Sequence, residues 1–367
     1  MTSRIAIDAH ALDGKKQGVQ TFIRQLFKEL FEIDRTNQYY LYCFEPERHR
    51  QEFPNANVHF RKLKSHNPIA RLLFELPLAL RRDNIDIGIF QYVSPPLSLR
   101  RKVVVVHDVL PITHPEYFPR LFRIRYDLLT RLSVATAASV VTVSATSQRE
   151  IHRAFNYPLE DIHVLGYGPS FPENEILAEV APSSINLPAE LAYGRYILAV
   201  GRIEKRKNID LLIRAFLKAD LPDVRLAVVG KQDLGYQLSP SADSRVVLLG
   251  SVEDDELLDI YRGAGLFVFP SVAEGFGIPL LDAVLFGLPA LSSGLTSMPE
   301  VAGSLAIYFD PLASNAEDEL ADRLRQHFTV KPIDRPTMQQ RLEHAHKFSW
   351  KTGAQDFLNV LENVQSG

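Results

Sequence analysis

Two carboxylates flank a glycine turn in SVAEGFGIPLLDAVLFGLPAL, residues 271–291. Glu274 follows the apolar run LFVFP, and Asp282 comes eight residues later. An acid in such a place can accept hydrogen bonds from sugar hydroxyls or stabilise a developing cation. Pro279 suits the first turn of a helix, because its missing N–H would have no partner there. We therefore expect Glu274 in the loop before a helix and Asp282 about one turn inside it, both able to point toward one ligand. The alternative is that Glu274 only caps the helix.

Four cations crowd the start of the segment GRIEKRKNIDLLIRAF, residues 201–216: Arg202, Lys205, Arg206 and Lys207. Like charges so close repel one another, so a bound anion would stabilise the cluster. A diphosphate fits, because Arg offers bidentate bonds and Lys a point charge. Asn208 is expected to cap the helix that follows. The alternative is a solvated basic turn.

Two loops of the first half also carry polar groups. His107 and Asp108 end the apolar run VVVV, where a histidine can hydrogen-bond a hydroxyl or carry a positive charge; the alternative is a histidine bonded to a loop carbonyl. His114, in the same loop, is expected to be structural.

Gly14 and Gly18 precede the first helix and would let backbone N–H groups approach an anion, unless they only form a flexible turn. Their spacing is not G-x-G-x-x-G, so the dinucleotide fingerprint is absent.

Strand-like and helical stretches that could position these residues alternate along the chain. Strands that are apolar at nearly every residue are typical of parallel sheets covered by helices, and the alternation predicts an α/β fold. The predicted strands are RIAIDAH, YYLYCF, DIGIF, VVVVHDV, SVVTVS, DIHVLG, YILAVGR, RLAVVG, RVVLLG, LFVFPS and PALSS, and the clearest helices are VQTFIRQLFKELFEI, RIRYDLLTRLSVATAA, IDLLIRAFLKA and DDELLDIYRGA.

The length of 367 residues suits about two domains. GYGPSFPENEILAEVAPSSINLPAELAYGR, rich in Pro, Ser and Glu, places the join near 170–194, between domains of residues 1–175 and 190–347. Residues 1–170 hold 23 Lys and Arg against 17 Asp and Glu, whereas the remainder holds 18 against 27. This asymmetry indicates that the two halves have different partners.

The single cysteine, Cys43, is expected to be buried and can form no internal disulfide or zinc cluster. The polar start MTSRIAIDAH lacks the apolar core of a signal peptide, and no run approaches the roughly 20 apolar residues of a membrane span. We therefore expect a cytoplasmic protein.

The segments VGRIEKRKNIDLLIRAF and FVFPSVAEGFGIPLLDAVLFGLPAL resemble the family 4 retaining glycosyltransferases. The resemblance extends over nearly the whole chain through GVQTFIRQL, HDVLPITHPEYF, VTVSATSQREI, LLGSVEDDELLDIYRGA, SSGLTSMPEVAG and FSWKTGAQDFLNVLENV, in order. It implies the GT-B fold: two Rossmann-like domains facing across a cleft, with a C-terminal helix of about 348–365 that crosses back to the N-terminal domain. The N-terminal domain would bind the acceptor and the C-terminal domain the nucleotide-sugar donor.

The resemblance also implies roles for acidic and basic residues. Arg202 and Lys207 match the pair that holds the donor diphosphate. Glu274 matches the first acid of the E-x7-E motif, which contacts the donor sugar. Asp282 stands where the second Glu normally binds the ribose. Asp is one methylene shorter, so either the helix lies closer or the ribose contact is weakened or water-mediated.

Further positions follow from the same resemblance. His107 matches the histidine that faces the donor sugar at the reaction centre, and Gly18 lies in the glycine loop that approaches the diphosphate. The expected catalytic residues are therefore His107, Arg202, Lys207 and Glu274. The remaining donor-binding groups are backbone amides of Gly275, Phe276, Gly277 and Ile278.

The implied reaction transfers a hexose from a nucleotide-diphosphate sugar to a glycan or lipid-linked glycan, by a front-side mechanism with retention. No D-x-D sequence occurs, so no metal and no cofactor are expected. HDVLPITHPEYF, GRIEKRKN and EGFGIPLLDA are most similar to bacterial mannosyltransferases of surface-polysaccharide assembly, which makes GDP-mannose the first expectation. A UDP-hexose or a deoxysugar donor stays open, and no nucleic-acid partner is expected.

Other functions remain as alternatives. A non-hydrolysing sugar-nucleotide epimerase would use the same fold but needs several acids around the sugar. A two-lobed sugar-binding protein would not need the basic cluster, and a periplasmic one would need an export signal. A nicotinamide-dependent dehydrogenase would need the glycine fingerprint.

Basic stretches of the first half suit an anionic membrane surface or a lipid-diphosphate-linked glycan: RKLKSHNPIARLLFELPLALRRD, SLRRK and PRLFRIRYDLLTR. They raise the expectation of peripheral contact with the inner face of the cell membrane. The alternative is that Leu72, Leu73, Leu76 and Leu80, at helical spacing, face the core.

Overall fold

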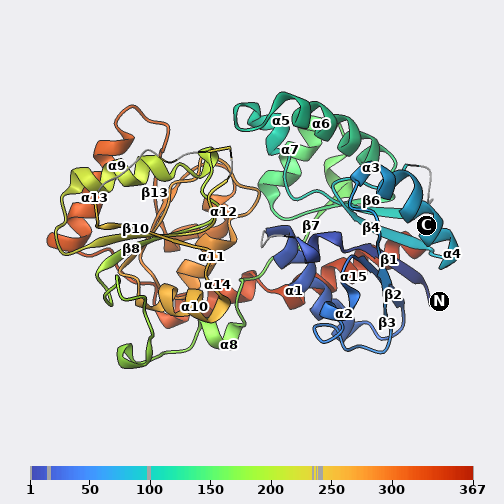
Figure 1. Ribbon diagram of the computed structural model, residues 1–367, viewed down its shortest axis with the longest axis horizontal. Coiled ribbons are helices and arrows are strands. Elements are labelled where there is room, and N and C mark those ends of the chain that lie inside the picture. The colour runs from blue at the N-terminus through green and yellow to red at the C-terminus, as the bar shows by residue number, and fades with distance from the viewer. Residues whose placement is uncertain are drawn as a thin grey trace. The chain divides into compact units, whose positions relative to one another are not determined.

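The computed structural model describes residues 2–14, 18–96, 101–233, 235–236, 238 and 243–366. They form two compact units, one of Met1–Gly168 with Phe348–Gly367 and one of Pro169–Lys347 (Figure 1). The first unit thus ends at Gly168, whereas the sequence analysis placed its end at residue 175 and the start of the second unit at residue 190. Residues 15–17 of the first glycine loop and residues 98–100 of the basic run SLRRK lie outside the described residues.

The first unit contains a parallel seven-stranded sheet in the order β3-β2-β1-β4-β5-β6-β7. Its central strands are buried along nearly their whole length, because helices cover both faces. The strands are β1 (Arg4–Asp8), β2 (Gln38–Cys43), β3 (Val58–Lys62), β4 (Ile87–Gln91), β5 (Arg101–Val105), β6 (Ser139–Thr142) and β7 (Ile162–Val164).

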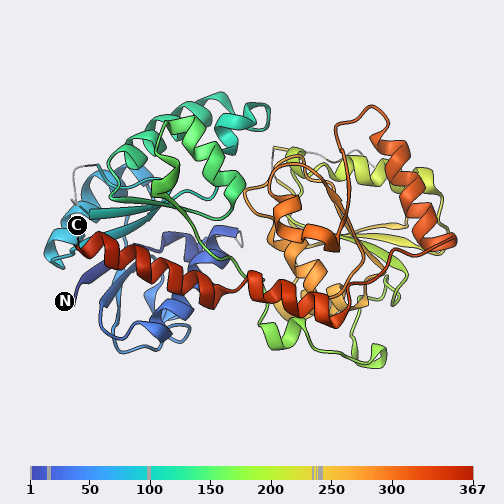
Figure 2. The ribbon, with the colours of Figure 1, turned by 180° about the vertical axis from the view of Figure 1, so that it is seen from behind.

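The helices of the first unit form two layers. Helices α1 and α15 pack against one another on one face of the sheet, and Figure 2 shows α15 in red. The helices are α1 (Gly18–Ile33), α2 (Pro46–His49), α3 (Pro68–Ala70), α4 (Leu76–Arg82), α5 (Leu110–Thr113), α6 (Arg120–Ala135), α7 (Ala145–Phe155) and α15 (Trp350–Ser366), with a π-helical segment η2 (Arg71–Glu75) and the short turns η1 (His10–Asp13), η3 (Pro115–Tyr117) and η4 (Leu159–Asp161).

The C-terminal helix α15 is part of the first unit through close packing. Its Gly353 lies against Gly166, so that a Cβ there would stand 2.0 Å from the Gly166 carbonyl oxygen. Trp350 lies over Tyr167 with ring centroids 4.6 Å apart, and Phe357 meets Phe27 of α1 edge-on at 5.9 Å. Only a residue without a side chain permits the approach at Gly353.

The second unit has a parallel six-stranded sheet in the order β10-β9-β8-β11-β12-β13. Helices α9 and α13 cover one face, and α10, α11 and α14 lie on the other (Figure 1). The strands are β8 (Tyr196–Val200), β9 (Arg225–Val229), β10 (Val246–Gly250), β11 (Leu266–Phe269), β12 (Ala290–Ser293) and β13 (Ile307–Phe309). The helices are α8 (Glu173–Ile176), α9 (Ile209–Ala219), α10 (Asp254–Gly263), α11 (Ile278–Leu285), α12 (Met298–Ala302), α13 (Ala316–Thr329) and α14 (Met338–Lys347), with the turns η5 (Pro182–Ser184), η6 (Lys205–Lys207) and η7 (Gly303–Leu305).

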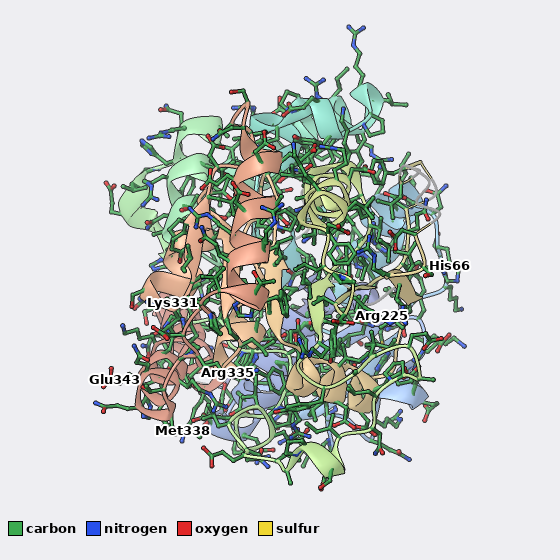
Figure 3. The ribbon with its side chains drawn as sticks, turned by 90° about the vertical axis from the view of Figure 1, so that its left-hand side faces the viewer. His66, Arg225, Lys331, Arg335, Met338 and Glu343 are labelled. Atoms are coloured by element: carbon green, nitrogen blue, oxygen red, sulfur yellow. The ribbon has the colours of Figure 1, made fainter. Side chains whose placement is uncertain are left out.

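The connection from α13 to α14 runs along the end of the second unit. Figure 3 shows Lys331 and Arg335 on this connection and Met338 at the start of α14. Arg335 donates a hydrogen bond to the carbonyl oxygen of Ala264, at the end of α10 (3.3 Å). The connection is therefore attached to the layer that also carries α11.

All the strands and helices named from the sequence are present, whereas β3 and β13 were missed. Both missed strands stand at a sheet edge. β3 reads VHFRK, with polar residues between its apolar ones, and β13 has only three residues. β3 and β13 therefore lack the continuous apolar run on which the prediction depended, whereas β10, at the other edge of the second sheet, has one in VVLLG.

We expect Phe357→Ala to destabilise the first unit by about 3–5 kcal/mol, because it leaves a cavity at a side chain that is fully buried against α1. Trp350, the only tryptophan of the chain, lies in the same unit, so its fluorescence during urea unfolding reports on that unit. Lys351→Ala, at an exposed position of the same helix, is the control. An equal unfolding midpoint for the two variants would contradict the proposed role of α15 in this core.

Candidate functional site

A buried ion-pair cluster lies where β8 and β11 end. These strands are neighbours in the sheet, so the loops that follow them meet at one edge. Glu274 accepts hydrogen bonds from Lys207 Nζ (2.5 Å) and from Arg206 Nη1 (2.8 Å). Glu274 and Lys207 are only 8% and 9% exposed. The structure therefore brings together two of the predicted residues, Lys207 and Glu274, and adds Arg206 to them.

Arg206 was one of the noted cations, but the sequence analysis gave it no separate role. Besides Glu274, it donates to the carbonyl oxygen of Ala273 (2.6 Å) and pairs with Glu204 (2.6 Å). Its own carbonyl oxygen accepts a hydrogen bond from Val272 N–H (2.8 Å). Arg206 thus holds the two loops together.

The cluster sets the charge of Glu274. Burial would raise the pKa of this carboxyl, but the charges and hydrogen bonds of Arg206 and Lys207 outweigh burial and lower its pKa to about 2. Glu274 is therefore ionised throughout the physiological pH range. It can accept hydrogen bonds or stabilise a positive charge, but it cannot serve as a proton donor.

Arg202 lies next to this cluster in the chain and is half-buried. Among the described residues, its guanidinium forms no hydrogen bond and no ion pair. The preceding Gly201 has φ 143°, a backbone conformation that favours glycine, and the Lys207 side chain lies over it, 3.5 Å from where a Cβ would stand. Arg202 is thus a cation of this loop that can bind an anion without first breaking an ion pair with a described residue.

The loop of residues 274–277 is held by two further residues, Thr296 and Ser297, to which the sequence analysis gave no role. Glu274 N–H donates to Thr296 Oγ1 (3.1 Å), and the Ser297 hydroxyl lies 3.0 Å and 2.7 Å from the carbonyl oxygens of Glu274 and Phe276. The segment SSGLTSMPEVAG contributed to the family resemblance, which was the one signal for them. All four predicted amide positions are buried: Gly275, Phe276, Gly277 and Ile278.

Helix α11 begins with Pro279 in its first turn, as the sequence predicted. Gly277 stands at the N-cap with φ 106°. Asn208 differs from the prediction: it occupies the N-cap of α9, but its side chain makes no capping hydrogen bond. Its backbone is left-handed, at φ 54°, which Asn tolerates better than most residues. The loop geometry, not side-chain capping, accounts for Asn208.

Asp282 lies inside α11 and is 2% exposed. Its Oδ1 accepts a hydrogen bond from Ser170 N–H (2.8 Å). Burial raises the pKa of this carboxyl to about 7, against the lowering effect of the Ser170 hydrogen bonds. The two acids of the opening motif therefore occupy different environments, and Oδ1 of Asp282 is bonded to Ser170, at the start of the second unit. Its contact with a ribose stays a prediction.

His107 lies in the first unit, just beyond β5, and is buried. Its Nε2 is 2.7 Å from Oε1 of Gln91, and Phe22 of α1 meets its ring edge-on at 4.8 Å. Burial lowers the pKa of the imidazole to about 3, so His107 is neutral. Burial thus disfavours a positive charge at this position, whereas hydrogen bonding to a hydroxyl is compatible with the structure.

Gln91 is a neighbour of His107 that the sequence analysis missed. It ends β4, next to β5 in the sheet, and its side-chain amide nitrogen is buried with no hydrogen-bond partner among the described residues. The run DIGIF predicted the strand but gave no sign that its last residue would reach the histidine. Gln91 is therefore the residue that orients His107 within the first unit.

Gly18 is the first residue of α1, and no described atom lies within 4 Å of where its Cβ would stand. Gly14 closes the turn η1, on the other side of residues 15–17. His114 contacts Thr113 Oγ1 (2.9 Å) and stacks near Tyr117, which is the structural role expected of it. An anion site at the glycine loop stays a prediction.

Metal binding and membrane spanning can both be judged from the described residues. No group of three or more His, Cys, Asp or Glu side chains there is arranged to hold a metal ion. None of the described helices is both long and apolar enough to span a membrane.

Two family models match the chain: "Glycosyl transferases group 1" over residues 191–336 and "Glycosyltransferase Family 4" over residues 16–168. The chain is 32% identical to O-antigen chain mannosyltransferase B of Escherichia coli, over 73% of this chain and 71% of that protein. It is 28% identical to O-antigen chain mannosyltransferase RfbU of Salmonella typhimurium, over 70% and 71% of the two chains. A crystal structure of Anabaena HepE in complex with UDP and glucose has a TM-score of 0.73 at 18% identity, covering 98% of this chain and 100% of that one, which shows a shared fold.

The environment of Asp282 predicts a pH-dependent stability. Because burial raises its pKa in the folded state from 3.8 to about 7, the folded protein binds this proton more tightly than the unfolded chain does. The stabilisation is complete below about pH 4 and is lost as the pH rises through 7. Asp282→Asn keeps an oxygen for Ser170 N–H but carries no charge, so we expect it to gain stability over the native protein at pH 8, on the order of 1 kcal/mol or more.

Thermal unfolding followed by circular dichroism between pH 5 and pH 8 measures this difference. Asp223→Asn, at an exposed position of the second unit, is the control. If Asp282→Asn were less stable than the native protein by the same amount at every pH, the buried carboxyl would not titrate as described.

Proposed function

Because this chain belongs to the family 4 glycosyltransferases, we propose that it transfers mannose from GDP-mannose, with retention of configuration, to a surface glycan or its lipid-linked precursor. Family membership establishes the reaction class, a glycosyl transfer, and the GT-B fold of two Rossmann-like units. The choice of sugar, nucleotide, acceptor and stereochemistry is our proposal.

The observation that carries the proposal is the ion-pair cluster of Glu274 with Arg206 and Lys207, beside the unpaired Arg202. When the bond between a sugar C1 and its diphosphate breaks, negative charge grows on the diphosphate and positive charge on the sugar ring. Preorganised cations stabilise the first and an ionised carboxylate the second. We assign Arg202 and Lys207 to the diphosphate and Glu274 to the sugar.

The charge balance of the loop supports a diphosphate ligand. The ion-pair network balances two cations, Arg206 and Lys207, against two acids, Glu204 and Glu274, and the unpaired Arg202 adds one further positive charge beside it. The surplus positive charge matches a diphosphate group, and Arg202 is free to form a bidentate bond with it. A neutral ligand would leave this surplus uncompensated, which disfavours the alternative of a binding protein for uncharged sugars.

The state of Glu274 also supports front-side transfer. Each of its oxygens accepts a hydrogen bond from a cation, and this lowers its basicity and its reactivity as a nucleophile. The departing phosphate, held by the cations, would instead take the proton of the acceptor hydroxyl. Neutral His107 would form a hydrogen bond with a hydroxyl of the donor sugar, and Gln91 would orient the imidazole ring.

The donor and acceptor are proposed from the relatives. Both mannosyltransferases act in O-antigen chain assembly, according to their names. We infer a mannosyl donor and a glycan acceptor of that kind, with the second unit binding the donor and the first the acceptor. HepE was solved with UDP and glucose, so UDP-glucose is the competing donor to compare.

Binding of GDP-mannose should raise the melting temperature more than binding of UDP-glucose or a dTDP-sugar, since a ligand stabilises the fold it binds. In Lys207→Ala we expect this shift to be lost and mannosyl transfer to a mannose-oligosaccharide acceptor to fall about 100- to 1,000-fold. Lys205→Ala, an exposed lysine of the same loop, is the matched control and should keep both.

The melting temperature of each ligand-free variant shows whether the fold is retained. A folded Lys207→Ala with more than about a tenth of the native transfer rate would remove Lys207 from the proposed role. Conversion of GDP-mannose to another sugar nucleotide without any acceptor would indicate the epimerase instead.

We further expect transfer to persist after treatment with EDTA, because Arg202 and Lys207 would neutralise the diphosphate that a divalent cation neutralises in other enzymes. The measurement compares initial rates before and after dialysis against EDTA, with added Mg²⁺ or Mn²⁺ as the control. A rate that collapses with EDTA and returns with the metal would mean that the reaction is metal-dependent.

A further inference from the structure

Helix α6 exposes its large apolar residues and buries its small ones. Leu121, Ile124, Leu128 and Leu132 follow one another at three- and four-residue spacing, so they share one side of the helix. All four are exposed, with Leu121 at 80% and Leu128 at 65%. The buried residues of α6 are Thr130, Ser133 and Val134. A surface helix ordinarily has the reverse arrangement, so packing within the unit does not explain this apolar stripe.

Small polar contacts attach α6 to the rest of the unit. The Ser133 hydroxyl donates to the carbonyl oxygen of Leu129 (2.8 Å) and accepts from Ser94 N–H (3.0 Å). Thr136 Oγ1 accepts from Lys102 Nζ (2.8 Å). Hydrogen bonds of Ser133 and Thr136 thus join α6 to the segments of Ser94 and Lys102, and its large aliphatic side chains take no part in these contacts.

A second apolar stripe lies on the segment from α3 to α4. Ile69, Leu73, Phe74 and Leu78 are exposed, Phe74 and Leu78 at 65% each. Leu76 and Leu80 of the same segment are buried, and Leu72 is half-buried. The alternative that all four predicted leucines face the core therefore holds for Leu76 and Leu80 but not for Leu73.

Both stripes belong to one helix layer. Leu76 and Leu80 pack in a cluster with Phe90 of β4, and Val134 of α6 packs in a cluster with Val104 of β5. Phe90 and Val104 are register partners and so point to the same face of the sheet. The segment from α3 to α4 and helix α6 thus cover the same face (Figure 1). We call the outer side of this layer, formed by the two stripes and their flanking arginines, the apolar-basic surface.

The charges of this surface are predominantly positive. Arg81, Arg120 and Arg125 are exposed and have no acidic partner among the described residues. The acids of the two segments are engaged: Asp127 pairs with Arg131 (3.0 Å), and Glu75 accepts backbone N–H bonds from Lys64 and Ser65. An apolar stripe flanked by unpaired arginines is the pattern of helices that lie in the plane of a membrane interface.

We propose that the apolar-basic surface binds an anionic lipid bilayer, with α6 lying in the plane of the interface. The leucines would enter the boundary of the acyl chains while the arginines meet the negative headgroups. A second copy of the chain fits less well, because a symmetric interface would set this positive surface against itself. The proposal rests on this surface alone and not on the proposed donor, acceptor or mechanism.

Sedimentation of the full chain with lipid vesicles tests the proposal at physiological salt. We expect the protein to pellet with vesicles of phosphatidylcholine and phosphatidylglycerol, and much less with phosphatidylcholine alone. The double substitution Leu121→Gln/Leu128→Gln keeps the net charge but removes apolar area, and we expect it to weaken binding by at least about ten-fold.

Leu312→Gln/Val330→Gln is the matched control. These residues of the second unit are 63% and 78% exposed, so the same substitution at equally exposed sites should leave vesicle binding unchanged. Arg120→Gln/Arg125→Gln should weaken binding and reduce its dependence on salt.

Three results would overturn the proposal. The first is no pelleting with the anionic vesicles, and the second is equal loss of binding in the Leu121/Leu128 and Leu312/Val330 variants. The third is a stable dimer in the absence of lipid that the Leu121/Leu128 variant dissociates, which would assign the surface to a second copy. None of these measurements needs a sugar nucleotide, so they leave the proposed transfer reaction untouched.

Discussion

The Glu274 carboxylate, held between Arg206 and Lys207, is the interaction on which the site of the second unit depends. It joins the loop after β8 to the loop after β11, and Arg206 adds bonds to Ala273 and Glu204. A buried carboxylate with only one of these cations would lose much of its compensation, and breaking such pairs is strongly destabilising. The sequence therefore needs the cations and the acid together, although 67 residues separate Lys207 from Glu274.

Different environments give three titratable groups that the sequence singled out, one in the first unit and two in the second, different charges. Glu274 stays charged because two cations bind it. Asp282 is buried without a cation beside it, so it keeps its proton up to about pH 7. His107 stays neutral because it is buried beside Gln91. An ionised acid and a neutral imidazole suit the binding and polarisation of the proposed sugar nucleotide. General acid–base catalysis would instead need a group whose pKa lies near neutral pH and that also reaches the reacting atoms.

The two units divide their charges in a way that agrees with different partners. The excess of basic residues lies in the first 170 residues and the excess of acidic residues in the remainder. In the first unit, unpaired arginines flank the leucines of α6, and in the second the cations gather at the strand-end loop after β8. One positive surface is therefore combined with apolar side chains, as the proposed lipid contact requires, and the other with a buried acid, as the proposed diphosphate site requires.

The sequence by itself determined the α/β class, the main strands and helices, and the positions of Lys207, Glu274 and Pro279, because buried parallel strands and helix-opening prolines leave strong local patterns. The edge strands β3 and β13 left none. Only the tertiary structure showed that Arg206 shares Glu274, that Gln91 reaches His107, that Ser170 binds Asp282, and that α6 faces outward. Each of these contacts and exposures depends on which residues from distant segments meet and on how much water remains around them. The spacing of residues along the chain encodes neither the meeting of distant segments nor the exposure to water.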